Sequence, residues 1–322
     1  MEPVIAVLIP CFNEAITIPK VIVDFRRVLP KATIFVFDNA STDDTARLAR
    51  EAGGVVRREP LRGKGNVVRR MFADIEADVY VLVDGDDTYD ASMAPTMIER
   101  LLEESLDMVN GARVSEVEAA YRSGHRFGNR VLTGTVALLF GNRLSDLLSG
   151  YRVFSRRFVK SFPALSEGFE IETELSIHAL QLRMPLSEVA TRYKERPEGS
   201  SSKLNTFRDG FRILRSILLL LRAERPFAFF AVVAVVLAGT SLALGTPVIF
   251  EYFHTGLVPR MPTALLAAAL MILGSLSLTC GLILETVSRG RVEFKRLGYL
   301  SVPIRFASVC RGEASGGYSG LV

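Results

Sequence analysis

The sequence has no tryptophan, and its 322 residues include only three cysteines, Cys11, Cys280 and Cys310. Cysteines that are odd in number and far apart exclude a disulfide framework and the paired spacing of zinc sites. Such cysteine usage fits a protein of the reducing cytosol. The formal net charge is only +4, so we do not expect the chain to bind nucleic acid.

Two phosphate-binding signatures are also missing. The sequence contains no Gly-x-x-x-x-Gly-Lys-Ser/Thr, which disfavours a phosphorylating NTPase. No Gly-x-Gly-x-x-Gly follows the first apolar run, at 4–9, which disfavours a dinucleotide-binding reductase. That run has no basic residue before it and is too short for a signal peptide, so we expect it to be a buried strand.

Charge is absent from two runs, 227–250 and 261–284, which have 24 residues each. Apolar helices of that length can span a bilayer, so we expect a transmembrane hairpin over 226–286. Small residues in it, Gly239, Gly274 and Gly281, would suit helix contacts in a homo-oligomer. By the positive-inside rule, basic residues at both outer ends predict a multi-pass protein of the inner (plasma) membrane with both termini cytoplasmic; these residues are Arg222, Arg225, Arg289, Arg291, Lys295 and Arg296.

The segments on either side of the hairpin are basic. In 201–225, leucines and phenylalanines recur at steps of three and four with arginines between them, which predicts an amphipathic helix lying in a membrane interface. The alternative is a helix packed on the soluble domain. We expect 287–322 to be a cytoplasmic basic tail, disordered over 307–322.

Residues 1–200 have the mixed polarity of a globular domain, in which strands and helices alternate with short connections. This order predicts an α/β fold with a doubly wound, mostly parallel sheet. Strands are expected at 4–9, 33–37, 55–56, 79–83 and 107–112. Helices are expected at 16–29, in a short segment ending at 50, at 66–76, at 127–140 and around 170–174.

Acidic or amide side chains follow three of these strands. The buried strand at 79–83 ends in Asp84-Gly85-Asp86-Asp87, and the other two end in Asn13-Glu14 and Asp38-Asn39. Asp-Gly-Asp alone is equally a polar turn. Since the carboxyl ends of parallel strands meet on one edge, we expect the three ends to converge beside Lys64, at the start of a helix, and form a nucleotide site. There Asp84 and Asp86 can share a divalent cation, and Lys64 with the helix amides can face phosphate.

Later candidates are less regular. A helix contains Glu170, Glu172 and Glu174, which is either a solvated face or, since 172 lies off the line of the other two, a face with one carboxylate pointing inward. Arginines are frequent between 113 and 152.

Seven motifs stand in a fixed order over about residues 4–290. They are Pro10-Cys11-Phe12-Asn13-Glu14, Asp38-Asn39-Ala40-Ser41-Thr42-Asp43, Gly63-Lys64-Gly65, Asp84-Gly85-Asp86, Ser149-Gly150-Tyr151-Arg152, Gly168-Phe169-Glu170-Ile171-Glu172, and a stretch from Tyr193 through Arg196 and Gly199 to Ser202-Lys203-Leu204. With the two apolar runs they resemble the polyprenyl-phosphate glycosyltransferases of family 2, GT-A-fold relatives of dolichyl-phosphate mannose synthase.

The resemblance implies roles for individual residues. The nucleotide-sugar donor, linked to UDP or GDP, would be bound by Pro10, Asn13, Glu14, Asp38, Asn39, Lys64, Asp84 and Gly85. Asp84 and Asp86 would hold Mg²⁺ or Mn²⁺ and act in catalysis together with Arg152. The donor diphosphate or the undecaprenyl or dolichyl phosphate acceptor would contact Arg113, Arg130, Ser149, Arg152, Glu172, Arg196, Ser202 and Lys203.

The acceptor determines the expected chemistry. A phosphate monoester is largely anionic near neutral pH, with a second pKa of about 6, and can attack a sugar without a strong base. One displacement would invert the anomeric carbon. A processive polysaccharide synthase is a rival, but those enzymes depend on Gln-x-x-Arg-Trp and this chain has no tryptophan. A non-catalytic membrane adaptor on the same scaffold is the other alternative.

Overall fold

The computed structural model describes residues 2–114, 144–168, 170–194 and 225–303, and the single residues 134, 141 and 222. The chain divides into two compact units, 1–210 with 295–322, called here the α/β unit, and 211–294, called the hairpin unit. The predicted boundary at 200, most of the predicted interfacial helix and the segment 307–322 lie outside the described residues.

A seven-stranded sheet forms the centre of the α/β unit, in the order β3-β2-β1-β4-β6-β5-β7. Among the described strands only β6 runs antiparallel to its neighbours, β4 and β5. The predicted doubly wound, mostly parallel sheet is therefore confirmed. Its strands are β1 (Ile5–Cys11), β2 (Thr33–Asp38), β3 (Val55–Arg58), β4 (Val79–Leu82), β5 (Met108–Val114), β6 (Arg152–Ser155) and β7 (Leu186–Arg192).

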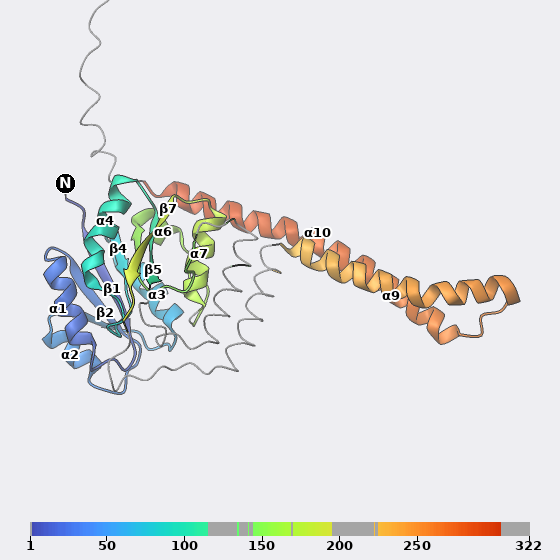
Figure 1. The fold of residues 1–322 in the computed structure, drawn as a ribbon, viewed down its shortest axis with the longest axis horizontal. Coiled ribbons are helices and arrows are strands. Elements are labelled where there is room, and N and C mark those ends of the chain that lie inside the picture. Colours follow the sequence, from blue (N-terminus) through green and yellow to red (C-terminus); the bar gives the residue numbers. More distant parts are fainter. Residues whose placement is uncertain are drawn as a thin grey trace, which may run out of the picture. The chain divides into compact units, whose positions relative to one another are not determined.

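Helices cover both faces of this sheet (Figure 1). The α/β unit contains α1 (Ile18–Val28), α2 (Thr45–Glu51), α3 (Lys64–Asp74), the 3₁₀ turn η1 (Ala91–Met93), α4 (Ala94–Glu103), α6 (Arg156–Ser161) and α7 (Ile171–Gln181). Alternate residues of a strand point to opposite faces, so Val7, Ile9 and Cys11 of β1 pack in one core cluster with α1 and α4. Burial on both faces explains why β1 and β4 are almost continuously apolar.

Aromatic rings fill the second face, between the sheet and α3 and α6. The ring of Phe72 lies edge-on to Tyr80, Phe154 and Phe162, with ring centroids 6.4, 5.9 and 6.0 Å away. Phe158 stacks on Phe154 at 4.4 Å. Each such pair contributes about 0.5–1.5 kcal/mol beyond its buried area, so this cluster fixes α3 and α6 on the sheet.

The hairpin unit is built from α9 (Pro226–Thr255) and α10 (Met261–Ser301), which lie side by side. Apart from Pro226 at the start of α9, its buried positions recur every seven residues, as in a left-handed helix pair. They are Ala234, Ser241 and Val248 on α9, and Ala267, Gly274, Gly281 and Ser288 on α10. Both helices are long and apolar enough to cross a membrane, and only 11% and 17% of their most apolar windows are buried.

Small residues bring these helices close. A Cβ on Gly281 would lie 2.9 Å from Cβ of Phe230, and the Ser241 hydroxyl donates to the Ala267 carbonyl at 2.7 Å. Gly274 and Gly281 are thus already used inside the hairpin, whereas Gly239 has no described atom within 4 Å of such a Cβ. Homo-oligomerisation stays a prediction, with Gly239 as the remaining glycine for it.

The second apolar helix is longer than the charge-free run that predicts it. Instead of giving way to a tail at 287, α10 continues to Ser301, and its last part belongs to the α/β unit from Lys295 onward. There Tyr299 donates to Asp107 Oδ2 at 2.7 Å, and the Arg157 guanidinium lies 4.8 Å from the Tyr299 ring centroid. Charge ends a membrane-spanning run but does not end a helix, which explains the difference.

Candidate active site

The candidate site lies at the carboxyl ends of β1 and β4, where the order in which strands are added to the sheet reverses. β1 pairs in parallel with β2 and with β4, so that Cys11 lies opposite Asp38 and Leu8 opposite Leu82. The chain winds outward from β1 to β3 and then returns to β4 on the other side of β1. Crevices at such switch points bind ligands in open α/β sheets. The predicted convergence of the three strand ends is confirmed.

Lys64 is the charged centre of this edge. Its ammonium group forms ion pairs with Asp84 Oδ1 and, at 2.6 Å, with Glu172 Oε1, and its side chain is 8% exposed. Burial alone would lower the pKa of Lys64, but the two carboxylates outweigh it and raise that pKa. Burial also raises the pKa of Asp84, an effect that Asp86 and Glu172 reinforce and Lys64 opposes. Glu172 is the inward glutamate of α7, since Glu174 instead accepts from the amides of Leu165 and Ser166.

Gly150 allows the backbone to pass directly against Asp84. A Cβ at this position would collide with Asp84 Oδ2, so only glycine permits this approach. The Gly150 amide donates to the Tyr89 hydroxyl at 2.8 Å, which holds the segment in place.

The side chains of Arg152 and Ser149 donate hydrogen bonds to backbone carbonyls of the protein, which corrects the prediction that they bind phosphate. Both are fully buried. Arg152 donates to the carbonyls of Ser149 and Leu147 at 3.0 and 2.7 Å, and the Ser149 hydroxyl donates to the Gly111 carbonyl. A guanidinium enclosed in this way braces the loop behind Gly150 instead of facing a ligand.

Close packing against the segment before α7 explains why glycine stands on either side of Lys64, at Gly63 and Gly65. A Cβ on Gly63 or Gly65 would collide with the carbonyls of Glu167 or Ser166, and the Gly65 amide donates to the Glu167 carbonyl at 3.0 Å. The segment before α7 therefore lies against the start of α3. The expectation that the α3 amides face phosphate is corrected for Gly65, whose amide already has this partner.

Asn13 and Asn39 brace the loops that follow β1 and β2. Asn13 Oδ1 accepts from the Thr42 amide at 2.8 Å, and Asn13 is one of six non-glycine residues with positive φ among those described. Asn39 donates to the carbonyls of Glu59 and Leu61 and accepts from the Gly63 amide at 2.7 Å. These amides shape the loops that surround the site, so direct donor contact stays a prediction for both.

Glu14 and Asp38 approach the site at the ends of β1 and β2. Thr17 donates to the Gly85 carbonyl at 2.6 Å and lies 3.4 Å from Glu14 Oε2, so the first loop is tied to the acidic strand end. Asp38 is 5% exposed and accepts from the Ser41 amide at 3.3 Å. Pro10 lies in β1 opposite Phe37. Their roles with a donor stay predictions.

Two carboxylates at this edge fit a hard divalent cation. Asp86 Oδ1 accepts from the Thr88 hydroxyl at 2.6 Å, and Asp86 is 4% exposed. Among the described residues, no cluster of three or more His, Cys, Asp or Glu could hold a metal alone. Mg²⁺ typically takes one or two carboxylates and completes its shell with water and substrate phosphates. Asp84 and Asp86 match that pattern.

Arg113, at the end of β5, forms a two-bond ion pair with Asp146. Its Nε and Nη2 donate to Asp146 at 2.7 and 2.8 Å. Burial of Asp146 acts to raise its pKa, but Arg113 outweighs burial and lowers it, so this carboxylate stays ionised. The other predicted phosphate ligands, Arg130, Arg196, Ser202 and Lys203, lie outside the described residues.

Thr17 and Tyr89 are the site residues that the sequence alone does not reveal. Tyr89 lies against Tyr151 and Tyr193, with ring centroids 5.5 and 5.4 Å away. Its position three residues after Asp86 is the one signal that could have indicated it. Thr17 has no sequence signal, because its contact with Gly85 joins residues 68 positions apart.

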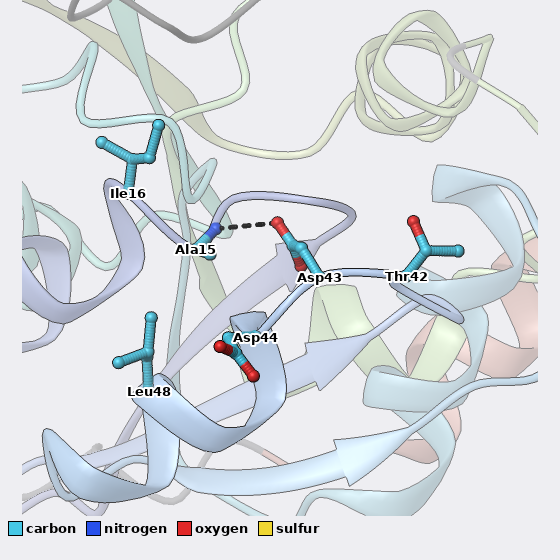
Figure 2. Close-up of a pocket in the computed structure, with 6 residues that line it drawn as sticks. All are labelled: Ala15, Ile16, Thr42, Asp43, Asp44 and Leu48. Carbon is cyan, nitrogen blue, oxygen red and sulfur yellow. Dashed lines mark hydrogen bonds between the residues drawn. The ribbon is translucent and has the colours of Figure 1, made fainter.

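A separate open pocket of about 580 Å³ lies beside the loops after β1 and β2 (Figure 2). Ala15, Ile16, Thr42, Asp43, Asp44 and Leu48 line it, and the Ala15 amide donates to Asp43 at 3.3 Å. None of the Lys64 contacts belongs to it, so we place the chemistry at the strand ends, where the charged groups converge.

Comparison with known proteins gives consistent matches. The family model "Glycosyl transferase family 2" matches residues 6–162. Glycosyltransferase AglJ of Haloferax volcanii is 35% identical over 250 residues, covering 77% of this chain and 82% of that protein. The dolichyl-phosphate hexose transferase of the same organism is 28% identical over 221 residues, covering 69% and 95%.

A solved structure shares the fold. Glucosyl-3-phosphoglycerate synthase from Mycobacterium tuberculosis, in complex with Mn²⁺, uridine diphosphate and phosphoglyceric acid, has a TM-score of 0.56 and 22% identity. The match covers 68% of this chain and 78% of that one.

Proposed function

Because the chain belongs to glycosyl transferase family 2, we propose that it transfers a sugar from a nucleotide sugar to the phosphate of a polyprenyl lipid. The observation that carries this proposal is the Lys64–Asp84–Glu172 cluster next to Asp86, at the switch point of the sheet. The similarity to a dolichyl-phosphate hexose transferase supports the lipid acceptor. The UDP and Mn²⁺ in a structural neighbour support a nucleotide donor and a divalent ion.

The site would control charge instead of supplying a strong base. An oxygen of the lipid phosphate attacks the anomeric carbon, the bond from that carbon to the diphosphate breaks, and the nucleoside diphosphate leaves with the electron pair. One such displacement inverts the anomeric centre. Mg²⁺ or Mn²⁺ at Asp84 and Asp86 would supply positive charge for the departing diphosphate.

Cationic side chains of the chain balance the remaining charge. Lys64 holds the Asp84 carboxylate in a fixed position through a charge-assisted bond. Arg113 lies at the end of β5 and would attract the incoming phosphate. Prearranged charges of this kind stabilise a transition state without reorganisation.

Two apolar helices support a membrane location for such an enzyme. The lipid acceptor lies in a bilayer, and the nucleotide sugar is dissolved in the cytosol. With the basic flanks that the sequence shows, we propose that the hairpin anchors the α/β unit to the cytoplasmic face.

The direct test uses purified full-length protein in detergent with undecaprenyl phosphate, Mg²⁺ and a panel of UDP- and GDP-sugars. We expect lipid-dependent release of nucleoside diphosphate with one donor, and a glycosylated lipid by mass spectrometry. Asp86→Ala should lower kcat at least about 100-fold, as loss of a charge-stabilising group does. Asp24→Ala, which removes a carboxylate from the surface pair with Lys20 on α1, is the matched control.

A parallel reaction with 3-phosphoglycerate tests a soluble acceptor. Transfer to 3-phosphoglycerate and not to the lipid would refute the lipid acceptor. Release that is equal in wild type and Asp86→Ala would refute the assigned site.

A further inference from the structure

Lys64 is held at the acidic edge by its backbone as well as by its side chain. The amide of the preceding residue, Gly63, donates to Asn39 Oδ1 at 2.7 Å. The amide of the following residue, Gly65, donates to the Glu167 carbonyl at 3.0 Å. The lysine side chain therefore leaves α3 from a fixed point. Since this side chain is only 8% exposed, its ammonium group stays beside the carboxylates that it binds.

Both carboxylates that bind Lys64 are fixed by other elements. Asp84 follows β4; its Oδ2 lies against the backbone at Gly150, and its Oδ1 accepts from Lys64. Glu172, in the first turn of α7, accepts from the same ammonium group at 2.6 Å. Each oxygen of Asp84 thus has a close neighbour, and one of these neighbours is positively charged. A cation that binds Asp84 has to share this carboxylate with the ammonium group.

Four charged groups interact at this edge. Burial raises the pKa of Asp84, Lys64 lowers it, and the charges of Asp86 and Glu172 raise it further. When all four groups are ionised, three carboxylates and one ammonium group give a formal charge of −2, and the carboxylates alone would give −3. Like charges a few ångström apart near a protein surface repel strongly. The ammonium group therefore lowers the affinity of this edge for a second cation.

We propose that Lys64 makes the binding of the divalent cation depend on the nucleotide-sugar donor. Alone, the cation competes with the ammonium group for Asp84 and binds weakly. The donor diphosphate supplies further negative charge, and the cation then binds tightly. Because coupling between two ligands is reciprocal, the cation raises the affinity for the diphosphate by the same factor, so the two enter and leave together.

This inference rests on the proposed function, which supplies the donor. The alternative is that Lys64 is only a brace that keeps the Asp84 carboxylate in place. The two roles predict opposite effects of removing the lysine. Loss of a brace weakens cation binding, whereas loss of a competing charge strengthens it.

The test is a Mn²⁺ titration of the detergent-solubilised full chain, followed by the electron paramagnetic resonance signal of free Mn²⁺. Lys64→Met should bind Mn²⁺ alone about tenfold more tightly than wild type, or better, because one opposing charge is removed. UDP should raise the wild-type affinity for Mn²⁺ about tenfold or more, after correction for the Mn²⁺ that UDP binds without protein. Lys31→Met, which removes a lysine from an exposed pair with Glu2, is the matched control and should bind Mn²⁺ as wild type does.

Two variants of Glu172 complete a charge series. Glu172→Gln leaves one negative charge fewer than wild type and should bind Mn²⁺ more weakly. Lys64→Met combined with Glu172→Gln restores the wild-type formal charge and should bind Mn²⁺ with an affinity close to that of wild type. Mn²⁺ should also raise the melting temperature of Lys64→Met more than that of wild type, because a tighter ligand stabilises the folded state more. Asp86→Ala should abolish Mn²⁺ binding, which would locate the ion at this edge.

The outcomes separate this inference from the proposed function. If Lys64→Met binds Mn²⁺ alone no more tightly than wild type, although Mn²⁺ and UDP bind together, the inference is refuted and the proposed function stands. Equal Mn²⁺ binding by Glu172→Gln and wild type would refute it too, and that comparison remains if Lys64→Met does not fold. If wild type binds no Mn²⁺ even with UDP, the metal site of the proposed function fails first, and the role of Lys64 fails with it.

Discussion

Lys64 has more negative charge around it than one ammonium group can neutralise. Asp84 and Glu172 bind it directly, and Asp86 lies two residues from Asp84. Of these three carboxylates Asp86 is buried, and Asp84 and Glu172 are partly exposed, with side chains 26% and 12% exposed. This excess of negative charge supports the proposal that a divalent cation binds at this edge.

Removal of Lys64 should expose this imbalance. We expect Lys64→Met to destabilise the protein by about 3 kcal/mol, since loss of one partner leaves buried charge uncompensated. For a domain of this size that corresponds to a melting temperature lower by roughly 10 °C. Thermal unfolding of the full chain in detergent measures it.

Two further variants check the cause. Lys64→Met combined with Glu172→Gln should recover part of the loss, because only one carboxylate is then unpaired. Lys31→Met removes an exposed ion pair with Glu2 and should leave the melting temperature almost unchanged. A double variant less stable than Lys64→Met would contradict the electrostatic explanation.

At the scale of elements, α6 and α7 pack around a buried histidine. His178 of α7 lies edge-on to Phe158 and Phe162, both with ring centroids at 5.3 Å, and its Nδ1 has no hydrogen-bond partner among the described residues. Burial lowers the pKa of His178 to about 3, and the ammonium group of Lys295 acts in the same direction. The ring is therefore neutral in the folded protein.

This histidine should make stability depend on pH. In the unfolded chain its pKa is about 6.5, so between about pH 6.5 and 3 the unfolded state binds the additional proton. The stabilising contribution is complete above about pH 6.5 and decreases as the pH falls, by at most about 1.4 kcal/mol per pH unit.

Melting temperatures at pH 5 and pH 7.5 test this dependence. The difference between the two pH values should be smaller in His178→Phe than in wild type, because phenylalanine does not titrate. His254→Phe, at an exposed position near the end of α9, should retain the wild-type difference. Identical pH dependence in wild type and His178→Phe would show that folding does not lower the pKa of His178.

Five strands of the α/β unit, β1 to β5, were predicted from sequence, and continuous burial on both faces of a parallel sheet explains the apolar runs of β1 and β4. The strands β6 and β7 were not predicted. The approach of the three strand ends followed from the topology. The Lys64–Glu172 pair could not be predicted, since it joins residues 108 positions apart. The resemblance to the polyprenyl-phosphate glycosyltransferases implied a phosphate-binding role for Arg152, and nothing in the neighbouring sequence reveals that backbone carbonyls accept its hydrogen bonds. Likewise, in the sequence the glycines beside Lys64 are as consistent with a phosphate-binding loop as with close packing. Only the structure shows that the carbonyls of Glu167 and Ser166 leave no room for a Cβ at these positions.

At the scale of the whole molecule, the α/β unit is completed by the end of α10. Tyr299 donates to Asp107 and accepts from Arg157 Nη1 at 3.2 Å, and Arg157 Nε donates to the Val302 carbonyl at 3.1 Å. Asp107 is 6% exposed and also accepts from the Ser155 hydroxyl at 2.6 Å. These contacts make residues 295–303 a structural part of the unit.

Tyr299→Phe should therefore destabilise the α/β unit, although the residue is far from the site in sequence. Loss of the hydroxyl takes a donor from a buried carboxylate, which costs about 1–3 kcal/mol. The melting temperature of the full chain should fall by several degrees. Tyr252→Phe, which makes the same change at a half-exposed position of α9, should have no effect. Equal melting temperatures for wild type and Tyr299→Phe would show that the end of α10 is not part of the folded unit.

The contact between Asp107 and Tyr299 also sets an order of events during biosynthesis. Tyr299 follows Asp107 by 192 residues, and both apolar helices are translated between them. Domains generally fold as they emerge from the ribosome, but this one lacks its closing partner until residues 295–303 have been translated. A polypeptide released before that point, with its sheet complete, would leave Asp107 and Arg157 without Tyr299. Such a chain would be less stable, and cellular proteases would therefore degrade it more readily. Transferase activity would then accumulate only in chains that also contain the hairpin.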